Sequence, residues 1–135
     1  MRFNPYLTFN GNCEEAMNFY KAVLNGEFTS LMRFSEAPAG VMQVPESANN
    51  LIMHCTLEFE GCTLMASDTL EEHFAQGNHA SLTINVNDAG KAETLFNGLL
   101  DGGKAIMPFA DAFWGGKFGM LTDRFGIQWM LTSDH

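Results

Sequence analysis

Two kinds of hydrophobic pattern run along the chain. Several short stretches alternate apolar and polar residues, most clearly at 54–59 and 80–86, and this period of two is typical of a strand with one buried face. Two longer stretches place apolar residues at positions i, i+3, i+4 and i+7, the spacing of an amphipathic helix. The residues on these two stripes are Ala16, Phe19, Tyr20 and Val23, and then Ala92, Leu95, Phe96 and Leu99.

The two patterns occur in the same order in each half of the chain. In the first half we expect a strand, a helix and three strands, at 3–9, 13–24, 27–34, 51–59 and 62–67. In the second half we expect the same sequence of elements, at 79–86, 88–100, 104–110, 117–122 and 127–132. Asn12 is expected to cap the first helix and Asn87 or Asp88 the second. The order is therefore β-α-β-β-β, twice.

The halves also resemble each other residue by residue. The segment AMNFYKAVLNG at 16–26 aligns with AETLFNGLLDG at 92–102 without a gap, including the closing glycine. Each half has one helix for four strands, so its own helix can cover only one face of its sheet. We predict an α+β fold of two paired βαβββ modules that form a curved mixed sheet around a concave cavity. It would be one domain, 1–135, with internal modules at 1–70 and 79–135.

Composition and charge narrow the range of functions. The formal net charge is −9, and the seven Lys and Arg residues are scattered, so no basic face for nucleic acid is predicted. No apolar run approaches the roughly 18–20 residues of a membrane span. The start, MRFNPYLTF, lacks the layout of a signal peptide, so we expect a cytoplasmic protein without a membrane partner. The three cysteines, Cys13, Cys55 and Cys62, are expected to be reduced thiols.

Two irregular segments stand out. Residues 35–50 contain Pro38 and Pro45 and are predicted to be a loop. The stretch FWGGKFGMLTDRFGIQW, at 113–129, combines glycines with aromatic residues, as a pocket wall does. Asp123 lies in the turn of this stretch and is interpreted as structural.

Four segments resemble the PhnB-like branch of the glyoxalase, bleomycin-resistance and extradiol-dioxygenase superfamily, also called the vicinal oxygen chelate superfamily. These are PYLTFNGNCEEAMNFY at 5–20, IMHCTL at 52–57, LMASD at 64–68 and FWGGKFGMLTDRFGIQWM at 113–130. The resemblance implies the glyoxalase-like fold and a homodimer. Some relatives carry the label of a demethylubiquinone methyltransferase. The sequence has no glycine-rich turn between a strand and a helix followed by an acidic residue, so a nucleotide-type adenosylmethionine site is not predicted.

The resemblance also indicates where metal-using relatives carry their four ligands. Carried over, the first-strand positions are Asn4 and Ser81, and the last-strand positions are Met65 and Met130. Imidazole and carboxylate groups are the ligands expected for such a divalent ion, and a thioether is soft. We therefore predict no metal ligands here and no cofactor. A rearranged metal site built from His54, His79 and Asp68 remains an alternative.

The favoured function is a PhnB-like small-molecule-binding protein without the usual catalytic metal. Its predicted ligand-binding residues are Tyr6, Thr8, His54, Met65, Asp68, Ser81, Trp114 and Met130. One alternative is a metal-dependent lyase, isomerase or dioxygenase of the superfamily. Another is a metal-free enzyme that uses His54 with Asp68 or Glu58 as acid and base. A structural or regulatory protein with a vestigial cavity is the third.

Overall fold

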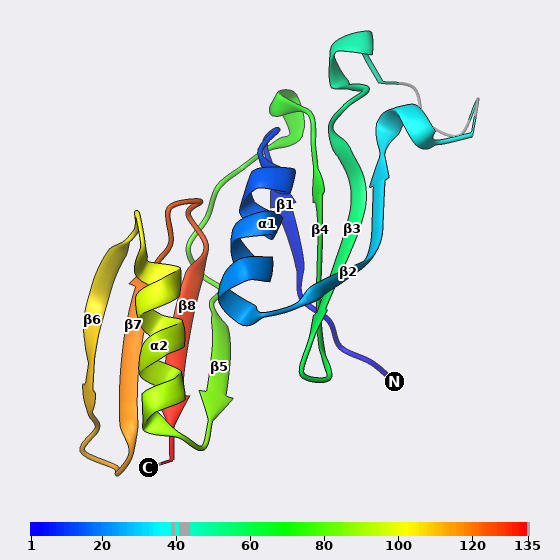
Figure 1. Cartoon of the computed structure of the whole chain (residues 1–135). Coiled ribbons are helices and arrows are strands. Elements are labelled where there is room, and N and C mark those ends of the chain that lie inside the picture. The colour runs from blue at the N-terminus through cyan, green and yellow to red at the C-terminus, as the bar shows by residue number, and fades with distance from the viewer. Residues whose placement is uncertain (39, 41–43, 135) are drawn as a thin grey trace. The chain divides into compact units, whose positions relative to one another are not determined.

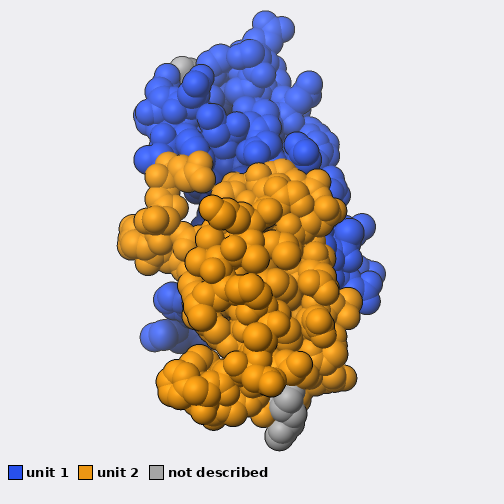
Figure 2. Space-filling view, turned by 90° about the vertical axis from the view of Figure 1, so that its left-hand side faces the viewer, with its two compact units in different colours: residues 1–75 blue, residues 76–135 orange. Residues whose placement is uncertain are grey.

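The computed structural model describes residues 1–38, 40 and 44–134. The chain divides into two compact units, Met1–Ala75 and Gln76–His135, which Figure 2 shows in two colours. We describe each unit by itself. In the described part of the chain, no helix is long and apolar enough to cross a bilayer.

Unit 1 contains a four-stranded sheet and one long helix (Figure 1). Its main elements are β1 (Tyr6–Phe9), α1 (Cys13–Leu24), β2 (Glu27–Arg33), β3 (Ile52–Phe59) and β4 (Cys62–Asp68). The strand order is β1-β4-β3-β2. β1 runs parallel to β4, whereas the other neighbours are antiparallel, so the sheet is mixed.

Unit 2 repeats this arrangement. Its elements are β5 (Leu82–Val86), α2 (Ala89–Leu100), β6 (Lys104–Asp111), β7 (Lys117–Thr122) and β8 (Gln128–Ser133). The strand order is β5-β8-β7-β6, with β5 parallel to β8. The predicted twofold β-α-β-β-β order is confirmed, as is the α+β class. That the two modules make one domain stays a prediction.

The strand starts differ from the prediction. β1 begins at Tyr6 and not at residue 3, and Phe3 is 97% exposed. Pro5 has no N–H to donate, and only its carbonyl oxygen joins the sheet, at 3.1 Å from the Met65 amide nitrogen. β5 likewise begins at Leu82 and not at residue 79, and the residues directly before it are exposed.

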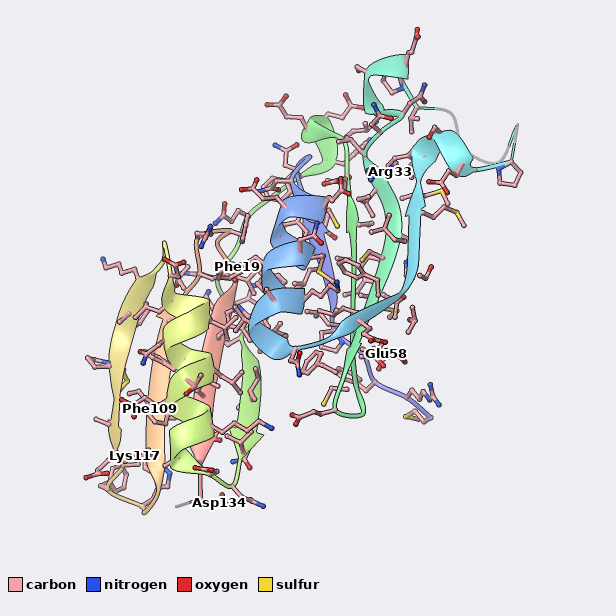
Figure 3. The ribbon with its side chains drawn as sticks, viewed as in Figure 1. Phe19, Arg33, Glu58, Phe109, Lys117 and Asp134 are labelled. Atoms are coloured by element: carbon pink, nitrogen blue, oxygen red, sulfur yellow. The ribbon has the colours of Figure 1, made fainter. Side chains whose placement is uncertain are left out.

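The predicted loop at 35–50 contains no strand in its described part. Two short 3₁₀ helices, η1 (Phe34–Glu36) and η2 (Glu46–Ala48), lie in this region, and a third, η3 (Glu71–His73), follows β4. Residues 39 and 41–43 of the loop lie outside the described part. Arg33, at the end of β2 (Figure 3), donates to both carboxylate oxygens of Glu14 at 3.0 and 2.7 Å and to the Asn50 carbonyl oxygen at 2.9 Å. It therefore ties α1 to both ends of this segment.

Each unit has its core between one sheet face and its helix, as Figure 1 shows for α1 and α2. In unit 1 the buried residues of the helix and sheet include Met17, Tyr20, Cys55, Leu57 and Ala66. In unit 2 they include Phe96, Leu99, Leu121, Trp129 and Leu131. The apolar stripes predicted from the sequence supply the helical side of both cores. Neither α1 nor α2 covers the opposite face of the sheet in its own unit.

The two helices begin in different ways. The predicted Asn12 cap is wrong, because the Asn12 side chain makes no capping hydrogen bond. The Asp68 carboxylate, at the end of β4, instead accepts from the Cys13 amide at 2.9 Å. α2 has the predicted local cap, since the Asp88 carboxylate accepts from the Gly90 amide at 2.8 Å.

The strands β2 and β6 each form one edge of a sheet and are irregular. Register shifts interrupt the pairing of β2 with β3 at two places, and the pairing of β6 with β7 at two places. β6 also contains Pro108, which has no backbone N–H. These features bend the two edge strands locally.

Candidate functional site

The face of the first sheet opposite α1 carries hydroxyl, imidazole and thioether groups. Tyr6 pairs with Met65, Met65 with Thr56, and Thr56 with Ser30, so these four residues form one row across the sheet. Paired residues, and residues two apart on a strand, share a face. The first open face is thus formed by Tyr6, Thr8, Ser30, Met32, His54, Thr56, Met65 and Ser67.

His54 lies between two hydroxyl groups on this face. Its Nε2 is 2.8 Å from Thr56 Oγ1, and its Nδ1 is 3.4 Å from the Tyr6 hydroxyl. The rings of Tyr6 and His54 have their centroids 5.8 Å apart. A neutral imidazole donates at one nitrogen and accepts at the other. Each tautomer therefore leaves one of the two hydroxyls, that of Thr56 or that of Tyr6, with its proton free for another acceptor.

Asp68 lies on the other face. It is two residues beyond buried Ala66 on β4 and is itself 5% exposed. Its two oxygens accept from the amides of Cys13 and Ile52, each at 2.9 Å. The Asp68 side chain therefore holds α1 and β3 together beside the end of β4, and it does not join His54 on the first open face.

The matching face of the second sheet is richer in methionine. Thr83 pairs with Met130, Met130 with Met120, and Met120 with Met107, in one row across four strands. A neighbouring row contains Asn85, Thr132 and Phe118, and the Asn85 amide donates to the Thr132 hydroxyl at 2.6 Å. The second open face comprises Thr83, Asn85, Met107, Phe118, Met120, Met130 and Thr132.

Trp114 lies in the connection between β6 and β7 and is 61% exposed. Its ring packs edge-on against Phe113, at 4.8 Å between centroids, and against Phe118, at 5.6 Å. Since Phe118 belongs to the second open face, Trp114 extends that face with an aromatic surface. Ser81 is exposed and directly precedes β5, two residues before Thr83.

The register fixes which positions of the two units correspond. Met65 is the partner of Tyr6 in unit 1, and Met130 is the partner of Thr83 in unit 2. Asn4 and Ser81 lie two residues before those partners. Amide, hydroxyl and thioether groups do not suit the hard or borderline divalent ion of the superfamily's metal-using members. Within residues 1–38, 40 and 44–134, no three His, Cys, Asp or Glu side chains cluster as a metal site would need.

The buried thiols are poor nucleophiles. Burial, with the nearby Asp68 carboxylate, raises the pKa of Cys13 far above its ordinary value, and burial raises the pKa of Cys55 to about 11. The reactive form of a cysteine is the thiolate, which neither residue supplies near neutral pH. Cys62 is exposed, at the β3–β4 hairpin. Cys55 is 1% exposed and belongs to the core of unit 1 as a small buried residue.

Of the predicted site residues, the structure brings Tyr6, Thr8, His54 and Met65 onto the first open face. Met130 lies on the second open face. The predicted ligand-binding residues did not include Thr56 and Thr83, which contact His54 and Met130. The alternation at 54–59 carried the signal for Thr56, since it places Thr56 on the same side as His54.

Comparisons with known proteins agree with this geometry. The sequence model of the family described as 3-demethylubiquinone-9 3-methyltransferase matches residues 1–132. Protein YjdN of Escherichia coli (strain K12) is 30% identical, over 97% of this chain and 94% of that protein. The crystal structure of protein PA1353 from Pseudomonas aeruginosa superposes with a TM-score of 0.89 at 37% identity, over 99% of this chain and 98% of that one.

Two further solved structures have the same fold as this chain. The PhnB protein from Bacillus cereus, a putative 3-demethylubiquinone-9 3-methyltransferase, has a TM-score of 0.80 at 28% identity, over 98% and 99% of the two chains. A glyoxylase/bleomycin resistance protein/dioxygenase domain from Frankia sp. EAN1pec shares the fold, with a TM-score of 0.70 at 12% identity over 100% and 98%. The chain has the glyoxalase/bleomycin-resistance/dioxygenase fold and belongs to the PhnB-like family described as 3-demethylubiquinone-9 3-methyltransferase.

Proposed function

We propose that this protein binds a small molecule through the open faces of its sheets, without the divalent metal that metal-using relatives hold. The observation that carries the proposal is the hydrogen-bonded group of Tyr6, His54 and Thr56 on a face that α1 leaves uncovered. Ligand sites combine an apolar surface with a few polar groups that fix orientation. The first open face has this composition, with Met32 and Met65 beside the polar group.

The proposed ligand contacts on unit 1 are Tyr6, Thr8, His54 and Met65, and those on unit 2 are Ser81, Trp114 and Met130. Asp68 is not among them, because both of its carboxylate oxygens hold backbone amides of unit 1. The hydroxyl groups and the imidazole offer hydrogen bonds in both directions. A ligand with carbonyl, carboxylate or phosphonate oxygens next to an apolar or aromatic body would match them.

Thermal melting against a panel of small acids, phosphonates and aromatic compounds tests the proposal. A ligand at 100 times its dissociation constant stabilises the folded protein by about 2.7 kcal/mol, which raises the melting temperature by several degrees. The His54→Ala variant should lose most of that shift. The matched control is His73→Ala, because His73 is exposed on η3 and pairs only with Glu72 among the contacts described, at 3.5 Å. No shift with any compound would contradict the proposal.

Metal analysis tests the second half of the proposal. Protein purified without chelator should contain no stoichiometric Zn, Ni, Mn or Fe. One equivalent of such a metal that disappears in His54→Ala would contradict the metal-free proposal and favour a metal-dependent lyase, isomerase or dioxygenase.

We also propose a cytoplasmic homodimer. The outer strands of both sheets have unpaired edges, and Ile106 on β6 is 53% exposed. All three cysteines are free thiols, the state that a reducing cytoplasm maintains. Sedimentation at micromolar concentration should give the mass of a dimer, and a monomer would contradict this proposal. Cell fractionation tests the location.

A further inference from the structure

Three methionines lie side by side on three neighbouring strands of unit 2. Met107 on β6 pairs with Met120 on β7, which pairs with Met130 on β8. Cross-strand partners direct their side chains to the same face, here the second open face. Neighbouring strands are about 4.8 Å apart, so the outer two residues are about 10 Å apart with Met120 between them.

The irregularity of β6 contributes to this row. A register shift between Ala105 and Met107 leaves Ile106 as an extra residue. Without that extra residue, the alternation of side chains along β6 would place Met107 on the face of the sheet that α2 covers. A bulge commonly redirects a side chain in this way. Met107 is 49% exposed.

Thioether sulfur is a soft ligand that selects soft metal ions such as Cu(I) and does not suit hard divalent ions. Methionine is unbranched, so the two outer side chains can lean towards the central one. We propose that Met107, Met120 and Met130 form a three-sulfur site for a soft monovalent cation, Cu(I) or its redox-stable analogue Ag(I). This site goes beyond the proposed small-molecule function, with which it shares Met130.

The present contacts of these sulfur atoms do not oppose the site. The Thr83 hydroxyl is 3.9 Å from the Met130 sulfur, a weak contact that a metal–sulfur bond would replace. Phe118 and Trp114 lie beside the row and supply an apolar boundary on one side. The buried thiols of Cys13 and Cys55 are not competitors, so Cys62 is the exposed thiol that an experiment must remove.

The test is a titration of the Cys62→Ser variant with Ag(I). The readout is the NMR signals of ¹³C-labelled methionine methyl groups. The chain has nine methionines, and we expect three methyl signals to shift together and saturate at one equivalent of Ag(I). Met107→Leu, Met120→Leu and Met130→Leu should each assign one of those signals. Each should weaken Ag(I) binding by about tenfold or more, because leucine keeps the bulk and removes the sulfur.

Two control variants separate the site from general methionine chemistry. The first is Met65→Leu, at the equivalent position on the first open face, and the second is Met17→Leu, on the buried side of α1 with no exposed surface. Both variants should bind Ag(I) with the same affinity as the Cys62→Ser protein. Unchanged affinity in Met120→Leu, or shifts confined to other methionines, would overturn the proposal. A negative result in the compound panel leaves this titration unaffected, so the two proposals fail independently.

Discussion

The two units have the same strand order and the same register, yet a buried carboxylate stabilises each of them at a different end. In unit 1, Asp68 is the last residue of the last strand and holds the start of α1 and the start of β3. In unit 2 the corresponding residue is Ser133, and the buried carboxylate is Asp123, before the last strand. Asp123 accepts from the amides of Phe125 and Ile127 and from the Trp129 ring nitrogen, at 2.8–3.0 Å.

The hairpins account for the position of Asp123. In unit 1, β3 and β4 are joined by Glu60 and Gly61, both with positive φ, at 47° and 78°, as in the tight turns that suit the twist of a hairpin. The connection between β7 and β8 in unit 2 is longer, and its backbone amides need an acceptor. Asp123 provides it. The repeat therefore preserves the sheet, while each buried carboxylate accepts from buried or partly buried N–H groups of its own unit.

The sharpest test of this comparison is Asp68→Ala. Two buried amides would lose their acceptor, at about 1–3 kcal/mol each, so unfolding by urea should show a loss of about 3–5 kcal/mol. Ser133→Ala, at the corresponding position of unit 2, should cost about 1 kcal/mol. Equal losses in the two variants would show that the units do not differ in this respect.

Asp123→Ala should have a somewhat smaller effect, of about 3 kcal/mol. The Trp129 ring nitrogen is buried, whereas the two backbone donors are only partly buried, so water can replace part of what they lose. Hydrogen exchange of the Phe125 and Ile127 amides is the local readout. Their protection should fall in this variant and stay unchanged in Asp68→Ala, and a reversed pattern would contradict the assignment.

Alanine substitutions at two glycines with positive φ separate the cost of backbone strain from the cost of a steric clash. Gly61 has φ 78° and open space where a Cβ atom would lie, so Gly61→Ala should cost about 1 kcal/mol. Gly116 has φ 71°, and a Cβ there would meet the Ser133 carbonyl oxygen, a backbone atom that cannot move freely. Gly116→Ala should therefore cost about 2–3 kcal/mol by urea unfolding. A larger loss of stability for Gly61→Ala than for Gly116→Ala would contradict this expectation.

The smallest effect concerns pH. The hydrogen bonds from Arg33 lower the pKa of Glu14 below its ordinary value near 4.3–4.5. Because the folded pKa is the lower one, the stabilisation is complete above the unfolded pKa and is lost as the pH falls through the folded pKa. Arg33→Ala should raise the Glu14 pKa towards its ordinary value. NMR of the Glu14 carboxyl carbon measures this change. Glu14→Gln should flatten the fall in stability below about pH 4.

Most of the fold was predictable from hydrophobic spacing alone. α1 has the predicted bounds, Cys13–Leu24, because a strong apolar stripe ends at Asn25, a left-handed residue that closes the helix. The cap of α1 could not be found locally, since its acceptor, Asp68, lies 55 residues away along the chain. Asp68 itself could have been placed, because the alternation Leu64, Ala66, Asp68 puts it on the buried face.

The site was predictable only in part. The alternation of β3 places His54 and Thr56 on one face, but the hydrogen bonds to His54 depend on the alignment of neighbouring strands, which no short pattern specifies. The methionine row shows the limit more clearly. Met107 reaches the second open face because of one extra residue in β6, and the sequence of that strand gives no sign of the shift.

The two irregular edge strands have a consequence for self-association. An unbroken edge strand is a template onto which another chain can add its own strand, and such addition leads to fibres. β2 and β6 each lose their regular spacing twice, and Pro108 removes a donor from β6. A second copy cannot continue either sheet there by a long ladder of backbone hydrogen bonds. Any dimer of this protein should therefore form through side chains on its surfaces, or through β1 and β5.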